Sequence, residues 1–565
     1  MKKQLLFALS ITVAVLFSAC KDLPDLDPSL FTCTPNPLEV KAGKVDAVVT
    51  GTFPVKYFKK NAVVTVTPVL KTSDGQVFKS APSVFQGQKV VGNDQLIEYK
   101  AGGTYSLNAS FDYVPAMDVS ELFLEFDVVA KKKEYELEPV KVADGVISTS
   151  ELAQKDGLES AVIADKFERD IFEMTDAEIL FLIQQSTVRK SETNTDDIKA
   201  LTKTIADAKE ALNKTVEGLK VSAYASPDGA LDLNTALAER RQKETEKFLN
   251  AELKKIGSSL AVETRFTPED WDGFQKLMEK SNIQDKDLIL RVLSMYNDPE
   301  QREREIKNLS AAYKQIADDI LPQLRRSQLQ LIVKVTGKSD EEIAQYAKGD
   351  VSKLNVEELL YAATLTNNLD EKAAIYQKVI DNYPNDVRGY NNLGVVKYQQ
   401  GKLDEAAALS AQALGKEANN ADANYNAGLV ALAQGANDKA IEYFGKAAGT
   451  TGDLENATGT YYVAQGEYDK AKSTFERVNT NNAALSQIIN KEYNAAKNTL
   501  ANVPNPDATT AYLGAVVAAR TNDKDGVYAN LKTAVGKDAA VAQRAATDLE
   551  FSKFWKDATF LSIVQ

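Results

Sequence analysis

Apolar and polar residues alternate along much of the first 150 residues. The runs 62–70 and 122–129 alternate with a period of two and are rich in β-branched or aromatic side chains. Such a period buries one face of a strand and leaves the other in solvent. Gly102-Gly103 marks a turn, and the three lysines from Lys131 are typical of a solvated hairpin turn. The pattern predicts an antiparallel β-sandwich over residues 35–149.

Strand and helix signals then mix over residues 150–340, which predicts an α+β domain. A helix at 196–217 would end at Gly218, and Asn234 would cap a second helix. A long helical insertion is expected at about 261–326. The predicted strands are 177–183, 219–223 and 329–335, and the second helix runs from 235 to 249.

The last third repeats itself every 34 residues. Gly394 recurs as Gly428 and Gly401 as Gly435, and the alanine pairs 406/440 and 413/447 keep the same step. A fixed period of this length predicts a solenoid of stacked helix pairs. We expect about six repeats between residues 355 and 538, within a domain that spans 350–565. An aromatic tail, with phenylalanines at 551, 554 and 560 and Trp555, is expected to cap the last repeat.

The first residues have the pattern of a targeting signal rather than of a structural element. Two lysines precede a 13-residue apolar run, which ends at Ser18-Ala19-Cys20. The run is too short to span a bilayer and predicts a signal peptide over residues 1–19. The sequence around the cut resembles a bacterial lipobox, which implies acylation of Cys20 and anchorage in a lipid bilayer. Ordinary secretion is the alternative. Residues 20–34 would be a tether.

Composition excludes several kinds of chemistry. The 565 residues include no histidine and two cysteines, and the formal net charge is −13. A Ser-His-Asp or Cys-His site, a His-ligated metal and a cysteine-based zinc or iron–sulfur site are therefore excluded. We predict no catalytic residue, no metal and no cofactor. An acidic chain is also poorly suited to nucleic acid, so no nucleic-acid partner is expected.

The stretch 223–249 resembles the peptidoglycan-binding domain of the OmpA C-terminal family. The resemblance rests on a strand, Gly229, Asn234 five residues later, and the pair Arg240-Arg241. It implies a zwitterionic diaminopimelate side chain held between a turn anion and the forked cation of Arg241. Ser226 stands where the family has its aspartate, and Asp228 is the candidate substitute. Fold alone does not carry that function.

The 34-residue period resembles the tetratricopeptide family, and the central copies match it most closely. The resemblance implies a groove that binds an extended peptide or a protein partner. The candidate groove residues are Asn391, Asn392, Asn424 and Asn426, and solvated helix positions without a ligand are the alternative. Asn392 and Asn426 occupy the same repeat position.

The order of modules resembles multidomain outer-membrane lipoproteins of Bacteroidota. It favours a non-enzymatic envelope adaptor that contacts peptidoglycan and recruits a protein partner, on the periplasmic face rather than the cell surface. A scaffold whose OmpA-like domain no longer binds peptidoglycan is the alternative. A remote alternative is a carboxylate-based envelope hydrolase, because Glu269, Asp270 and Asp272 flank Trp271. Capping of a helix accounts for these acids without catalysis.

Overall fold

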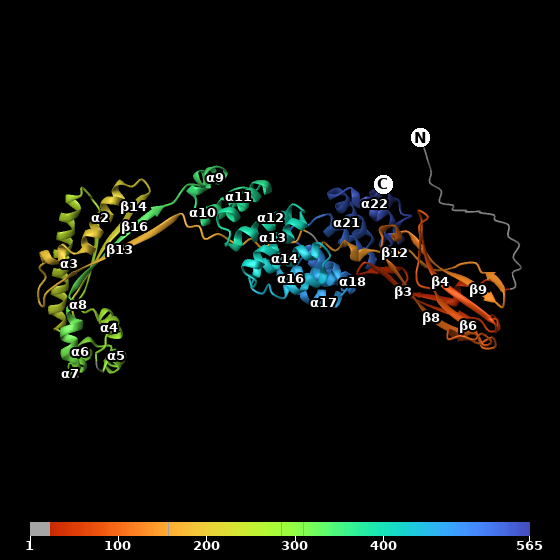
Figure 1. Ribbon diagram of the computed structural model, residues 1–565, viewed down its shortest axis with the longest axis horizontal. Helices are drawn as coiled ribbons and strands as arrows, with labels where there is room; N and C mark the ends of the chain where they lie inside the picture. Colours follow the sequence, from red (N-terminus) through yellow and green to blue (C-terminus); the bar gives the residue numbers. More distant parts are fainter. Residues whose placement is uncertain (1–22, 156, 284, 309) are drawn as a thin grey trace. The chain divides into compact units, whose positions relative to one another are not determined.

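The computed structural model describes residues 23–155, 157–283, 285–308 and 310–565 (Figure 1). The predicted signal peptide and Cys20 lie outside the described residues. The chain divides into two compact units. The first combines the residues up to Ala164 with those from Thr366 onward, and the second is Asp165–Leu365. In the described ranges, no helix combines the length and the apolarity that a membrane crossing requires.

The first unit begins with a β-rich region of two sheets. One sheet has the order β1-β3-β2-β12, with β8 paired to β3; the other has the order β10-β9-β4-β6-β7, with β11 on β9 and β5 on β4. Their inward side chains share one core, which includes Phe53, Leu70 and Phe85. The strands are Phe31–Thr34 (β1), Leu38–Lys41 (β2), Lys44–Phe53 (β3), Ala62–Thr72 (β4), Val77–Lys79 (β5), Ser83–Gly87 (β6), Gln95–Ile97 (β7), Gly103–Asp112 (β8), Ser120–Ala130 (β9), Lys133–Glu136 (β10), Val140–Asp144 (β11) and Val146–Ile147 (β12).

This region starts earlier than the sequence predicts. Strand β1 falls within the predicted tether 20–34, because Phe31 is buried against Phe126. The lysine run is a turn as expected: Lys131 has a positive φ of 59° between β9 and β10. A 3₁₀ helix, Thr149–Leu152, follows the last strand.

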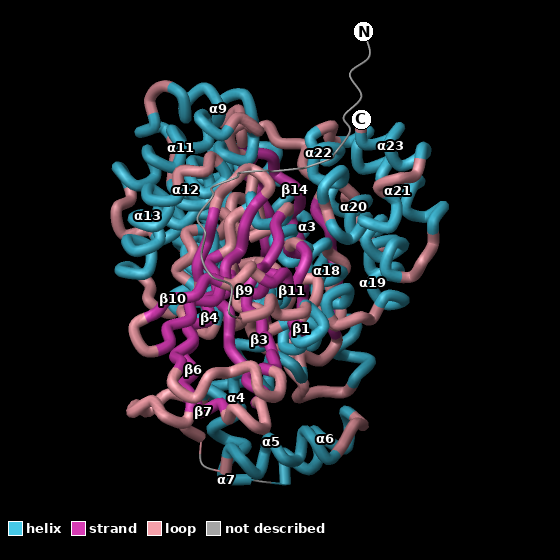
Figure 2. Tube along the Cα trace, turned by 90° about the vertical axis from the view of Figure 1, so that its right-hand side faces the viewer, coloured by secondary structure: helices cyan, strands magenta, loops and turns pink. Residues whose placement is uncertain are grey.

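The second half of the same unit is helical. Thirteen helices follow one another, and those from α12 to α21 pair as repeats. Figure 2 shows α18, α20 and α21 as neighbours in this stack. The helices are Leu369–Asn382 (α11), Val387–Gln399 (α12), Leu403–Lys416 (α13), Ala421–Ala433 (α14), Asn437–Phe444 (α15), Leu454–Ala464 (α16), Tyr468–Thr474 (α17), Asn481–Ile489 (α18), Tyr493–Ala501 (α19), Ala508–Arg520 (α20), Lys524–Lys537 (α21), Ala540–Thr547 (α22) and Ala558–Val564 (α23).

Small residues let the two helices of a repeat touch. A Cβ built on Gly428 would lie 2.4 Å from the ring of Phe444, so no larger residue fits there without displacing that ring. Gly401 has a φ of +72° and ends α12, as its position in the repeat predicts. The aromatic tail packs on the last helices, where Phe551 and Phe560 are fully buried.

The second unit holds a four-stranded sheet with the order β13-β16-β14-β15. Neighbouring strands are antiparallel except β14 and β15, which run parallel. The helices α2 and α3 pack on the sheet through Leu201, Ile205 and Leu249. The elements are Asp170–Leu180 (β13), Lys190–Thr193 (α1), Asp196–Glu210 (α2), Lys214–Tyr224 (β14), Leu231–Lys255 (α3), Val262–Thr267 (β15) and Arg326–Thr336 (β16).

Several predicted boundaries in this unit are wrong. The helix predicted at 196–217 stops at Glu210, because the residues from Lys214 on pair with β16. Gly218 therefore lies at a register shift inside β14 instead of ending a helix. Asn234 lies inside α3, which begins at Leu231, and its amide donates to Gly229 O at 3.0 Å.

The helical insertion is shorter than predicted, because residues 262–267 are strand β15. In its described residues, a short π-helix (Ile316–Ile320) and five α-helices form it, and they close a core of their own around Phe274, Met278 and Ile289. These are Trp271–Lys280 (α4), Lys286–Met295 (α5), Pro299–Asn308 (α6), Ser310–Gln315 (α7) and Leu321–Leu324 (α8). The helices Asp340–Lys348 (α9) and Val356–Ala362 (α10) complete this unit.

The two compact units differ from the predicted domain limits at two further points. Residues 150–164 belong to the unit of the helical repeats and not to the α+β domain predicted at 150–340. Residues 350–365, which the sequence places in the repeat domain, belong to the second unit. The first difference bears on the candidate site, because part of the segment 150–164 contacts the repeats.

Candidate interaction groove of the repeat array

The segment 153–164 lies along the first helices of the repeats, and we call it the strap (Figure 1). Its described residues are in neither helix nor strand. Ala161 is buried and Ile163 half-buried, whereas Val162 and Ala164 are exposed, an alternation typical of extended chain. The strap belongs to the same compact unit as the array.

Three asparagines of the array hold the strap by its backbone. The side-chain oxygen of Asn392 accepts from Ile163 N at 2.9 Å, and its amide donates to Ile163 O, also at 2.9 Å. Asn426 binds Ala161 in the same way, at 2.9 and 2.6 Å. Asn482 binds Gln154 at 2.9 and 2.8 Å. Each amide thus satisfies both polar backbone groups of one strap residue, as a neighbouring β-strand would.

Further contacts join these pairs into a network. The Asn391 amide donates to Ala161 O at 3.1 Å and to Asn392 Oδ1 at 3.0 Å. Asn391 Oδ1 in turn accepts from Asn426 at 2.9 Å. These three asparagine residues are at most 5% exposed, so the network is dry and its loss would leave buried polar groups unpaired.

Side chains of the strap fit small apolar sites of the array. Ala161 is 3% exposed and lies in a cluster with Tyr425 and Leu429. Ile163 packs against Val387 and Tyr390. The Tyr425 hydroxyl donates to Glu159 O at 2.8 Å, and burial raises the pKa of that hydroxyl. Apolar side-chain contacts of the strap thus include Ala161 and Ile163, and Leu158 packs on the same cluster as Ala161.

An acidic group holds the other end of the strap. The Gln154 side chain donates to Asp507 Oδ2 at 3.0 Å, and Asn481 donates to Asp507 Oδ1 at 3.0 Å. Burial acts to raise the pKa of Asp507, but the hydrogen bonds from Thr510, Gln154 and Asn481 outweigh it and the pKa is lowered. This carboxylate stays ionised and accepts from both amides.

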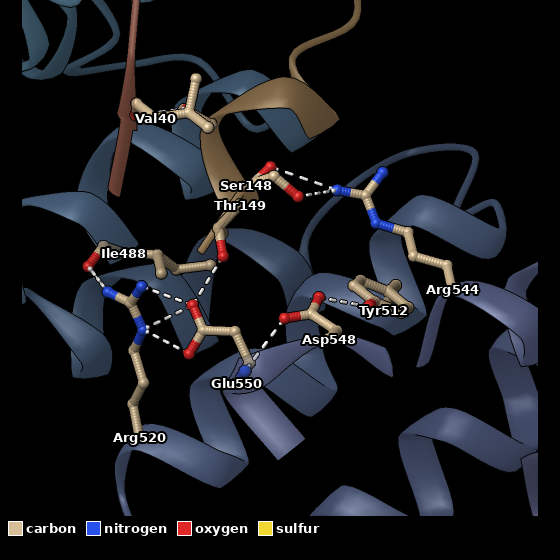
Figure 3. Close-up of polar contacts among 10 residues, drawn as sticks. Val40, Ser148, Thr149, Ile488, Tyr512, Arg520, Arg544, Asp548 and Glu550 are labelled. Atoms are coloured by element: carbon tan, nitrogen blue, oxygen red, sulfur yellow. Dashed lines mark hydrogen bonds and ion pairs between the residues drawn. The ribbon is translucent and has the colours of Figure 1, made fainter. Parts of the chain in front are cut away.

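A polar junction fixes the residues just before the strap to the end of the array (Figure 3). The Thr149 hydroxyl donates to Glu550 Oε1 at 2.6 Å, and Arg520 Nε donates to Glu550 Oε2 at 2.9 Å. Arg544 donates to Ser148 O at 3.2 Å. Burial acts to lower the pKa of Arg520, but its bonds to Glu550 raise it overall, so the guanidinium stays charged.

Three of the four predicted groove residues contact the strap. These are Asn391, Asn392 and Asn426. Asn424 points elsewhere: its amide donates to Ala418 O and Asn420 O, at 3.0 and 2.8 Å, and so fixes the loop before its own helix. The strap, Tyr425 and the pair Asn481-Asn482 were not predicted from the sequence. That pair repeats Asn391-Asn392 and was a usable signal.

The predicted diaminopimelate residues do not form an open site. Arg241 is fully buried, and its guanidinium donates to three backbone oxygens, of Gln185, Tyr224 and Leu182, at 3.0, 2.8 and 3.3 Å. Burial lowers its pKa to about 10. Because the guanidinium is buried and three of its five N–H donors bind backbone oxygens, this conformation does not present Arg241 to a ligand carboxylate, and its predicted role stays a prediction.

Ser226 and Asp228 are paired with a different arginine. The Ser226 hydroxyl donates to Asp228 Oδ1 at 2.6 Å, and Arg325 Nη2 lies 3.3 Å from Asp228 Oδ2. The Asn234 amide also contacts Glu269 Oε1, at 3.4 Å. The four predicted residues thus hold the turn and the helix start together.

Two of the three acids of the hydrolase alternative make structural contacts. Asp270 Oδ1 accepts from Gly273 N at 2.9 Å and caps α4, and its other oxygen pairs with Arg326 at 3.0 Å. Glu269 accepts from the Trp271 indole at 2.9 Å. Within the described ranges, no group of three or more acidic or cysteine side chains is placed to hold a metal ion.

Comparison with known proteins identifies the repeats. The model of the family "Tetratricopeptide repeat" matches residues 391–453, which run from within α12 to beyond α15. No curated protein matches the chain.

Three solved structures are similar to parts of the chain. YrrB, a TPR protein with an unusual peptide-binding site, is 21% identical over 30% of this chain and 94% of its own, with a TM-score of 0.24. A tetratricopeptide repeat protein from Parabacteroides merdae is 14% identical over 42% and 94%, with a TM-score of 0.30. PilW, a type IV pilus biogenesis factor, is 15% identical over 40% and 98%, with a TM-score of 0.28.

Proposed function

We propose that this chain is a non-enzymatic scaffold whose tetratricopeptide array binds extended protein segments by their backbone. The observation that carries the proposal is the set of paired hydrogen bonds from Asn392, Asn426 and Asn482 to the strap. An amide that satisfies both the N–H and the C=O of one residue recognises any extended chain, as strand addition does.

In this conformation the array holds a segment of its own chain. The strap connects the β-rich region to the second unit in sequence, so its capture fixes the route of the chain between them. A partner segment that uses the same asparagines has to displace the strap. Its preferred form would follow the strap: a small residue at the position of Ala161 and an aliphatic residue at that of Ile163.

The envelope setting is part of the proposal. The lipobox-like sequence before Cys20 supports a lipid-anchored protein of the outer membrane, held on its periplasmic face. The closed environment of Arg241 favours the version of the scaffold that does not bind peptidoglycan through this residue. The second unit is then a structural module of the scaffold.

A peptide-binding measurement tests the proposed groove. Ala161→Pro removes the N–H that donates to Asn426 and frees the strap. We expect a labelled peptide of residues 153–165 to bind this variant of the full soluble chain, and to bind the unmodified chain far more weakly because its groove is filled. The same peptide with proline at position 161 is the control. If proteolysis shows that the strap of the variant is free and the peptide still does not bind, the groove proposal is wrong.

A further inference from the structure

Three loops meet at one end of the β-rich region. The pair Phe53 with Gly103 sets the end of β3 level with the start of β8, and the pair Ala62 with Ala130 sets the start of β4 level with the end of β9. The loops at these strand ends are 54–61, 88–102, which includes the short strand β7, and 131–134, whose last two residues open β10. Two backbone bonds tie the first two loops together, from Lys89 N to Lys60 O at 2.6 Å and from Lys56 N to Tyr99 O at 2.7 Å. We call these loops the basic end.

The basic end differs in charge from the rest of the protein. Its loops contain eight lysines and three acidic residues, in a chain whose net charge is −13. Five of the lysines are exposed and form no ion pair with any residue in the described part of the chain: Lys56, Lys89, Lys100, Lys131 and Lys132. Cations held without counter-charges on an acidic protein favour an anionic partner.

Exposed apolar side chains lie among these lysines. Val91 is fully exposed, and Val55 and Leu96 are 59% and 51% exposed. Single exposed apolar residues are common, but three beside a group of unpaired lysines match the composition of surfaces that rest in the interfacial zone of a bilayer.

The start of the described chain lies at the same end. Leu23 is only 8% exposed and packs with the β-rich core, and the Tyr57 hydroxyl donates to Pro24 O at 2.7 Å. Cys20 precedes Leu23 by three residues, which can span at most about 10 Å. An acyl chain on Cys20 would therefore bring a bilayer surface close to the basic end.

We propose that the basic end docks on an anionic lipid surface, with lysines on headgroup phosphates and Val55 and Val91 in the interface. This inference rests on the proposed lipid anchor, and it adds an orientation: the end that carries the anchor lies against the membrane. Asp25 and Asp27 of the tether reduce the positive charge there but do not cancel it. Each lysine adds a contribution that salt screens.

Vesicle co-sedimentation tests the surface without the anchor. The probe is the chain from residue 20 onward with Cys20→Ser, mixed with vesicles of phosphatidylcholine alone or with phosphatidylglycerol. We expect partition onto the anionic vesicles at low salt and loss of it at high salt. Reversal of three lysines (Lys56→Glu, Lys100→Glu, Lys131→Glu) should lower the partition coefficient by roughly a hundredfold or more.

The matched control reverses three exposed lysines elsewhere, Lys276, Lys439 and Lys532, and changes net charge equally. Equal losses in both triple variants, or no binding by the parent chain, would overturn the proposal. As a second readout, the indole emission of Val91→Trp should shift to the blue on anionic vesicles, and no shift would also count against it. Failure of the anchor is separate, because it shows as unchanged membrane retention of Cys20→Ala in cells.

Discussion

Asn426→Ala removes the central contact of the strap. Ala161 N–H then loses its partner, whereas Ala161 O keeps the Asn391 amide at 3.1 Å. A buried N–H without a partner costs about 1–3 kcal/mol, and the lost bond to the C=O adds about 1 kcal/mol. We therefore expect the free energy of strap opening to fall by about 2–4 kcal/mol. The opened population rises by about 30- to 700-fold, since each 1.4 kcal/mol is tenfold.

Native-state proteolysis reports this opening. A glutamate-specific protease can cleave after Glu159 only when the strap leaves Tyr425, whose hydroxyl binds Glu159 O at 2.8 Å. When opening and closing are fast relative to cleavage, the cleavage rate follows the opened population. The rate at Glu159 should therefore rise by the same factor, about 30- to 700-fold, in the variant.

Asn424→Ala is the matched control, because it removes a buried asparagine from the same helix. Its amide binds Ala418 O and Asn420 O and does not touch the strap. This variant should lower the melting temperature of the array without a selective rise in cleavage at Glu159. If both variants accelerate cleavage equally, the strap is not held by Asn426 and the reasoning fails.

Three further predictions concern the packing of the chain and the lipobox-like sequence before Cys20. Arg241→Ala leaves three backbone oxygens without their donor and should lower the free energy of unfolding, measured in urea, by on the order of 3–5 kcal/mol. Arg240 is exposed, so Arg240→Ala should change this free energy by less than about 0.5 kcal/mol. Gly428→Ala should lower the stability of the array by about 1–3 kcal/mol in a thermal melt, because its Cβ would lie 2.4 Å from an aromatic ring. At Gly394 the nearest atom is 3.5 Å away, so Gly394→Ala should be nearly neutral in the same measurement. Cys20→Ala should move the protein from the membrane to the soluble fraction, and continued retention would contradict acylation.

The repeats could be predicted because their packing depends on side-chain size at fixed spacing. Gly428 and Ala440 are selected by contact between helices, and such selection leaves a period in the sequence. The β-rich region was predictable for a similar reason, since alternation of buried and exposed positions along β4 and β9 is visible in the residues themselves.

The strap could not be predicted in the same way. Its main contacts use backbone N–H and C=O groups, which every residue except proline supplies, so residues 154–163 needed no recognisable motif. Only the asparagines opposite carried a signal. The state of Arg241 was hidden too, because it depends on the carbonyls of Leu182 and Gln185, which come from a loop distant in sequence.

Site-resolved amide hydrogen exchange of the unmodified chain tests the occupied groove most directly. The amides of Gln154, Ala161 and Ile163 donate to asparagine side chains, and they should exchange slowly. Val162 is 45% exposed, and its N–H has no hydrogen-bond partner among the described residues, so it should exchange much faster. The account predicts this alternation along the strap. Exchange of all four amides at the rate of an unstructured peptide would contradict it.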